Sequence, residues 1–321
     1  MTVRESFAIG PARVRAGTAR DLEIPITRLI TGADVGLPVR IVHGREDGPV
    51  VWVNAATHGD EVVGVEVIRR LLAALSPRTL RGTLIAVPVL NVLGVMSGER
   101  YLPDRRDLNR SFPGSARGSL ASRIAHLMMT EVVAKCEVGI DLHTGSDRRS
   151  NLPQIRGDLD DPRTRELATA FGAPVLLHSR VRDGSLRHAA VEQGATVLLY
   201  EGGEAWRFDE WAVAAATDGV RRVLGALGMV DADDAGPSAP SVECRQSGWV
   251  RARHTGFLHL DVQLGQAVEE GERLGSLSDS FGRTLRLVRA DRTGIVIGRA
   301  EAPVVNGGDA VVHIAERSAQ G

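Results

Sequence analysis

Short apolar runs alternate with helically spaced apolar residues from about residue 48 to about residue 230. Runs of strand length, rich in β-branched residues, predict buried strands at 51–57, 83–90, 137–143, 173–178 and 195–201. Apolar residues at helical spacing predict helices at 61–75, 119–136, 185–194 and 209–227. This alternation is typical of an α/β fold with a mostly parallel, mixed sheet flanked by helices.

The pattern changes after residue 230. The segment 231–241, DADDAGPSAPS, is acidic and rich in Pro and Ser, which predicts a linker between a domain over 1–230 and a second unit over 242–321. That second unit consists of short alternating runs punctuated by Gly, so we expect a small all-β module. It is similar to the barrel-sandwich hybrids of the biotinyl and lipoyl domains, but it contains no lysine. A swinging-arm carrier is therefore excluded, and a packing or lid role is expected.

Charge and cysteine content exclude several classes of protein. A formal net charge of −1 gives no basic field for nucleic acid or anionic lipid. Cys136 and Cys244 lie far apart and form no CxxC pair, so neither a zinc knuckle nor a disulfide framework is expected. The first residues lack the apolar core of a signal peptide, and no long uncharged apolar window follows. We expect a cytoplasmic protein without membrane or nucleic-acid partners, and the sequence leaves a homo-oligomer possible.

The segment THGDE separates a predicted strand from a predicted helix and carries His58 and Glu61. In open α/β sheets the ligand site lies outside the carboxyl ends of the strands, which is where these side chains are expected. Asp60 is expected to cap the helix. An imidazole and a carboxylate suit a catalytic zinc ion, which takes three protein ligands and leaves a position for water.

Two other predicted strands end in groups that could complete the site. EVGIDLH ends in His143, a third candidate ligand, and Asp141 lies two residues earlier on the same strand face, where it could orient a ligand histidine. LLYEGGE places Glu201 at another strand end. The alternative is that these histidines fill the core, but their register at three strand ends favours a site for one zinc ion per chain.

The stretch 91–114 is predicted to be a long irregular loop, and such loops in compact domains are usually functional. It carries Arg100, Asn109 and Arg110, and a guanidinium group matches a carboxylate bidentately. Arg105 and Arg106 lie in the same loop, but they could instead be surface residues paired with Asp104 and Asp107.

Four motifs in this order, HGDE, DLNRSFPG, DLHTG and YEGG, resemble the succinylglutamate desuccinylase/aspartoacylase family of the zinc carboxypeptidase-like fold, over about residues 48–230. The C-terminal module is also similar to one that many of these deacylases carry. The resemblance implies zinc ligands His58, Glu61 and His143, a general base and acid at Glu201, and a substrate grip by Asn109 and Arg110 with help from Arg100.

The segment RYLPDRRDLNR is longer than in true aspartoacylases, so N-acetylaspartate and succinylglutamate are not implied as substrates. NLPQIR, after His143, is similar to a branch of uncharacterised deacylases, in which Arg148, Arg149 or Arg156 could line the pocket.

The predicted reaction is hydrolysis of a small N-acyl amino acid or related amide by a metal-activated water. A zinc carboxypeptidase that acts on short peptides is the nearest alternative. A metal-binding but inactive protein that acts through its β module is another, although a retained Glu201 argues against it. Glu204 is the alternative base.

Overall fold

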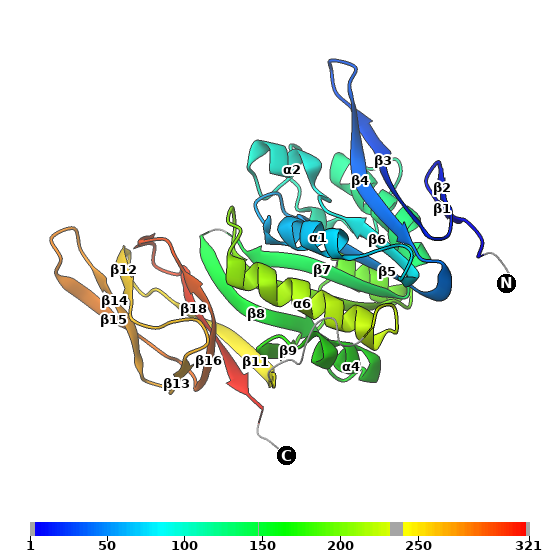
Figure 1. The fold of residues 1–321 in the computed structure, drawn as a ribbon. Coiled ribbons are helices and arrows are strands. Elements are labelled where there is room, and N and C mark those ends of the chain that lie inside the picture. The colour runs from blue at the N-terminus through cyan, green and yellow to red at the C-terminus, as the bar shows by residue number, and fades with distance from the viewer. Residues whose placement is uncertain (1–3, 147, 232–239, 319–321) are drawn as a thin grey trace.

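One sheet of twelve strands runs through the residues that the computed structural model describes, 4–146, 148–231 and 240–318 (Figure 1). Its order is β13-β16-β18-β11-β9-β8-β10-β7-β5-β6-β4-β3. The strands of the α/β part are β3 (Thr18–Arg28), β4 (Asp34–His43), β5 (Glu46–Ala55), β6 (Arg81–Val87), β7 (Val138–Gly145), β8 (Arg149–Gly157), β9 (Val175–His178) and β10 (Thr196–Glu204). A separate hairpin pairs β1 (Phe7–Ile9) with β2 (Ala12–Val14).

The sheet is mixed. Parallel pairs join β6, β5, β7 and β10 in the centre and β8 to β9, whereas β3, β4 and the β8–β10 pair are antiparallel. The five predicted strands coincide with β5, β6, β7, β9 and β10. Sequence reasoning missed β3 and β4, because exposed positions interrupt the apolar runs that mark a buried strand. It also missed β8, which is mostly buried but carries polar residues at several buried positions.

Helices cover both faces of this sheet. They are α1 (Val63–Ala74), α2 (Val92–Ser97), α3 (Leu120–Leu127), α4 (Pro162–Phe171), α5 (Leu186–Glu192) and α6 (Glu210–Ala226), with short 3₁₀ turns η1 (Leu108–Arg110) and η3 (Val133–Lys135) and a π-helical turn η2 (Met128–Val132). One apolar core packs α1, α4 and α6 against one face, and a second packs α3, η2 and α5 against the other. Within the described ranges, no helix combines the length and the apolar character needed to span a bilayer.

Three predictions about helices and loops need correction. The helix expected at 119–136 changes from α to π to 3₁₀ along its length. Asp60 is not a helix cap, because α1 starts at Val63 and its first turn has no side-chain cap. The stretch 91–114 is not wholly irregular, since it contains α2, which Asn91 caps by accepting a hydrogen bond from the Gly94 N–H.

The C-terminal part is all-β, as the sequence predicts. Its strands are β11 (Val242–Arg251), β12 (Gly256–Leu260), β13 (Ala267–Val268), β14 (Arg273–Ser278), β15 (Thr284–Arg289), β16 (Gly294–Ala300), β17 (Val304–Val305) and β18 (Ala310–Arg317). They enclose a separate apolar core. β11 pairs in parallel with β9 and β16 pairs antiparallel with β8, so this module extends the main sheet (Figure 1). Most of the predicted linker, residues 232–239, lies outside the described residues, so the linker stays a prediction.

Candidate active site

A pocket of about 270 Å³ opens where several strands of the α/β part end. Its walls combine His58, Glu61, Arg100, Asn109, Arg110, His143, Asn151, Arg156, Arg187 and Glu201 with Trp249 of the C-terminal module. The three candidate ligands, Glu201 and the expected substrate contacts Arg100, Asn109 and Arg110 therefore line one cavity.

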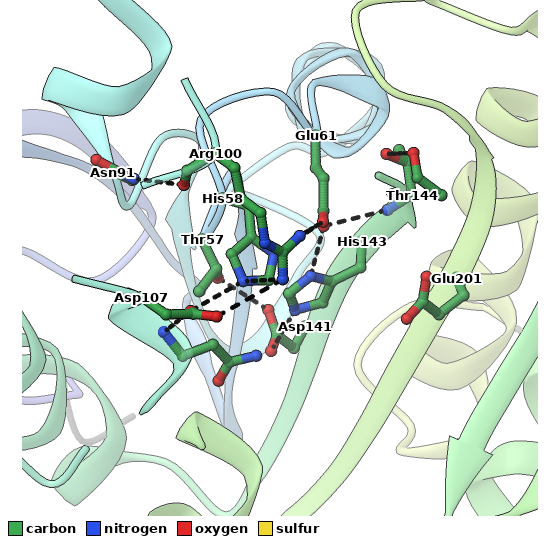
Figure 2. A network of polar contacts seen from close by, with 12 residues as sticks. Thr57, His58, Glu61, Asn91, Arg100, Asp107, Asp141, His143, Thr144 and Glu201 are labelled. Atoms are coloured by element: carbon green, nitrogen blue, oxygen red, sulfur yellow. Dashed lines mark hydrogen bonds and ion pairs between the residues drawn. The ribbon is translucent and has the colours of Figure 1, made fainter. Parts of the chain in front are cut away.

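Three buried donors meet at this pocket. His58 follows β5, Glu61 precedes α1, and His143 lies in β7, two residues before its end. Nδ1 of His58 lies 2.8 Å from one carboxylate oxygen of Glu61, and Nδ1 of His143 lies 2.6 Å from the other (Figure 2). The three side chains form a group that could hold a metal ion.

The opposite ring nitrogens are held by other carboxylates. Asp141 lies 2.9 Å from Nε2 of His143, and it also accepts hydrogen bonds from the side chains of Asn54 and Thr57. Asp107 lies 3.1 Å from Nε2 of His58. A carboxylate that accepts the Nε2 proton leaves Nδ1 free to bind a metal, which is the usual arrangement around ligand histidines.

Charges in this cluster shift one another's titration. Burial would raise the pKa of Glu61, but the two imidazole rings outweigh it and hold that pKa well below its usual range. Burial would lower the pKa of His143, but Asp141 and Glu61 raise it well above normal. Burial also opposes ionisation of Asp107, yet the hydrogen bond with His58 and the nearby Arg100 lower its pKa to about 2. Glu61 and Asp107 are therefore charged at neutral pH and favour a cation beside them.

The expected substrate residues Arg100, Asn109 and Arg110 line the pocket. Nη1 of Arg100 donates to Glu61 at 2.9 Å, and its Nη2 lies 3.0 Å from Nε2 of His58 (Figure 2). The Asn109 side-chain oxygen accepts from the Leu186 N–H, which fixes η1 against α5. Burial, together with Arg182 and Arg100, lowers the pKa of Arg110, so this part of the pocket is rich in positive charge.

Glu201 points toward the pocket from β10 without touching the three donors (Figure 2). Its Oε2 accepts a hydrogen bond of 2.8 Å from the Asn151 amide, and its Oε1 lies 3.5 Å from the Arg156 guanidinium. Glu204, the alternative base, pairs with Arg207 at 3.0 Å and does not line the pocket. The geometry thus favours Glu201 over Glu204.

Arg187 in the pocket and Asp107 behind His58 were not predicted from the sequence. Only 6% of Arg187 is exposed, and its Nη1 has no hydrogen-bond partner among the described residues. Burial and the nearby Arg156 lower its pKa to about 10. Arg187 lies in a helix that was predicted from the spacing of its apolar residues, and that spacing gives no sign that a charged residue is buried there. Asp107 was expected at the surface, but the fold of the 91–114 stretch brings it to His58.

The three arginine candidates in and just before NLPQIR differ in position. Arg156 reaches Glu201, and Arg149 lines the pocket and lies over the Trp249 ring, 5.5 Å from its centroid. Arg148 is not among the residues that line the pocket. The wall formed by Trp249 could not be predicted, because it depends on how the C-terminal module docks.

Comparison with known proteins shows the family to which the chain belongs. The model of the succinylglutamate desuccinylase/aspartoacylase catalytic domain matches residues 47–227. The chain is 32% identical to N-alpha-acetyl-L-2,4-diaminobutyric acid deacetylase of Halomonas elongata, over 88% of this chain and 86% of that protein. It is also 32% identical to a succinylglutamate desuccinylase of Burkholderia cenocepacia, over 60% of this chain and 61% of that protein.

Solved structures share the fold over nearly the whole chain. A succinylglutamate desuccinylase/aspartoacylase of Rhodobacter sphaeroides has a TM-score of 0.83 at 27% identity and covers 94% of this chain and 96% of its own. The product-bound ectoine utilization protein EutE (DoeB) of Ruegeria pomeroyi has a TM-score of 0.85 at 23% identity, with 98% and 96% covered. The C-terminal module is thus included in the shared fold.

Proposed function

Since the chain belongs to the succinylglutamate desuccinylase/aspartoacylase family, we propose that it is a zinc-dependent hydrolase that cleaves the amide bond of a small N-acyl amino acid. The observation that carries this proposal is the convergence of His58, Glu61 and His143 in the pocket that Glu201 also lines. Metal donors and a separate carboxylate in one cavity are what a metal-assisted hydrolysis needs.

His58, Glu61 and His143 would hold the zinc ion. Two imidazole nitrogens and a carboxylate are a ligand set of catalytic zinc sites, and Asp141 and Asp107 support the two histidines as outer partners. When bound, zinc lowers the pKa of a water molecule to roughly 7 and polarises the amide carbonyl. The buried carboxylates offset the positive charge of such an ion.

Glu201 would move the proton. Its carboxylate would accept a proton from the attacking water and deliver it to the amine nitrogen as the C–N bond breaks, which a carboxylate within hydrogen-bond reach can do. Arg100 would help to stabilise the negative charge on the former carbonyl oxygen. Water supplies the hydroxyl of the released acid, and the amine leaves with the transferred proton.

Arg110 and Asn109 would bind the carboxylate of the amino-acid part, and Arg187 adds a buried positive charge to the same pocket. An α-carboxylate fits this environment. The Halomonas elongata relative is named for N-alpha-acetyl-L-2,4-diaminobutyric acid, so this compound is the first substrate that we propose. A zinc carboxypeptidase is less compatible with the site, because Trp249 closes one side and the pocket is small for a peptide.

The test is a panel of N-acetyl and N-succinyl amino acids, with dipeptides alongside, on protein reconstituted with zinc. We expect about one zinc per chain and release of an acyl group rather than of a C-terminal residue. His143→Ala should lose both the zinc and the activity. Full zinc occupancy in His58→Ala and His143→Ala, or cleavage of the dipeptides alone, would overturn the proposal.

A further inference from the structure

The motif NLPQIR forms most of β8 and lies between Glu201 and the C-terminal module. On one side β8 pairs with β10, which carries Glu201. On the other side it pairs with β16 of the module, and Asn151 stands opposite Gly298 in that ladder. The Gln154 amide donates to the Ile297 carbonyl of β16 at 3.2 Å, which adds a side-chain bond to the ladder. The module and the candidate base are therefore attached to the same strand.

Asn151 makes the contact that matters for Glu201. Its Nδ2 donates to Oε2 of Glu201 at 2.8 Å, and Arg156, from the same strand, lies 3.5 Å from the other oxygen. Asn151 is buried, with only 6% of the residue exposed. A buried amide bonded to one carboxylate oxygen restricts how that carboxylate can turn, and a productive proton transfer depends on that orientation.

Gly298 lets the module approach Asn151 closely. A Cβ atom at position 298 would lie 2.9 Å from Oδ1 of Asn151, 3.2 Å from the His313 Cβ and 3.3 Å from Trp249. The first of these contacts is closer than real Cβ atoms come to a neighbour, so the Asn151 amide would have to shift. The Asn151 amide can therefore occupy its position only because residue 298 of β16 is a glycine.

We propose that Asn151 is a positioning residue for the Glu201 carboxylate and that β16 of the C-terminal module, through Gly298, holds Asn151 in place. This inference rests on the proposed function, because Glu201 must be the proton-transfer group for its position to matter. It gives the module a role in the reaction besides forming a wall: the module sets the geometry of a base that belongs to another part of the chain.

The experiment compares Asn151→Ala, Asn151→Asp and Gly298→Ala with wild type, on the N-acyl amino acid that wild type hydrolyses fastest. Asn151→Asp keeps the shape of the side chain but has no N–H to donate, so it tests the contact even if the Ala variant folds poorly. Each variant should lose about 10- to 100-fold in kcat, because a misplacement of about 1 Å can cost a hundredfold. KM should change little, and zinc content should match wild type.

Gly307→Ala is the matched control, because it lies in the same module and a Cβ there would meet nothing closer than 3.8 Å. It should keep the wild-type kcat. The double variant Asn151→Ala/Gly298→Ala tests whether Gly298 acts through Asn151. If it does, the second substitution causes no further loss of kcat. Fully additive losses would mean that Gly298→Ala acts elsewhere, for example through Trp249, and would overturn the role of β16.

Crystal structures of wild type and Gly298→Ala give a readout without substrate. The distance from Asn151 Nδ2 to Glu201 Oε2 should lengthen beyond about 3.5 Å in Gly298→Ala and stay within hydrogen-bond reach in Gly307→Ala. An unchanged kcat in both Asn151 variants, while Glu201→Gln is slow, would sink this inference alone. An unchanged kcat in Glu201→Gln would instead sink the proposed function.

Discussion

His143 has a carboxylate at each ring nitrogen, Glu61 at Nδ1 and Asp141 at Nε2. His58 lies between Glu61 at Nδ1 and Asp107 at Nε2, and Nη2 of Arg100 also lies 3.0 Å from that Nε2. Each histidine thus presents Nδ1 to the same carboxylate while its outer nitrogen is fixed. Asp141 could be predicted, because alternate residues of a strand share a face. Asp107 could not, because an irregular segment carries it to His58 and no periodicity describes that path.

The arginine grip is testable at the level of one side chain. Arg110→Ala should raise KM and lower kcat/KM on substrates with a free carboxylate by about 10- to 100-fold, since hydrogen bonds to charged groups contribute about 1.5–3 kcal/mol. The matched substrate is the same compound with its carboxylate converted to an amide, on which the loss should be far smaller. Equal losses on the two compounds would make Arg110 a structural residue.

At the scale of elements, the ends of parallel strands bring the site together. β5, β7 and β10 were predicted from their apolar runs, and the candidate ligands and Glu201 follow these strands or lie near their ends. Strand β8 escaped prediction because its sequence, RSNLPQIRG, has few apolar residues and a proline in the middle. Its pairing to β16 is a contact between segments far apart in the chain, which a local pattern cannot reveal.

Helix α1 packs so closely on the sheet that one of its positions admits only Gly. A Cβ at Gly64 would lie 2.6 Å from the Ala55 Cβ and 2.7 Å from the Leu142 Cβ. Helix propensity favours Gly64→Ala by up to about 1 kcal/mol, but overpacking costs about 1–3 kcal/mol. We expect a net loss of stability in urea unfolding. Ala73→Gly, on the exposed part of α1, measures the propensity effect alone, and a more stable Gly64→Ala protein would contradict the packing argument.

At the scale of the whole molecule, the module docks by continuing the sheet and adds Trp249 to the pocket. The sequence predicts that the module exists and is all-β, because its Gly-punctuated runs differ from the helical periods before it. It does not predict where the module lies. Trp249 stacks on His313 with ring centroids 4.6 Å apart, so a buried titratable ring supports the wall of the pocket.

His313 should make the protein sensitive to acid. Burial, with Arg156 and Arg292 nearby, lowers the pKa of His313 from 6.5 to about 3. The folded state then binds fewer protons than the unfolded state, so stability falls as pH drops below 6.5, and the loss continues down to about 3. Between pH 6.5 and 5 this group alone should cost about 2 kcal/mol.

His313→Phe removes that proton uptake and keeps a ring against Trp249. Thermal or urea unfolding at several pH values should therefore show a weaker acid dependence in this variant than in wild type. His254→Ala, at an exposed position of the same module, should follow the wild-type curve. If His313→Phe and wild type lose stability in parallel as pH falls, His313 is not the sensitive group.

Proton transfer by Glu201 in a zinc site is the centre of the account, and kcat together with zinc content of Glu201→Gln tests it most directly. Gln is nearly isosteric but cannot accept the proton of the water, and such transfer contributes about 10²–10⁴-fold. The variant should keep the wild-type zinc content and hydrolyse the substrate at least about a hundredfold more slowly, while Glu204→Gln stays near wild type. A near-normal kcat in Glu201→Gln would contradict the account, and a slow Glu204→Gln beside it would identify Glu204 as the base.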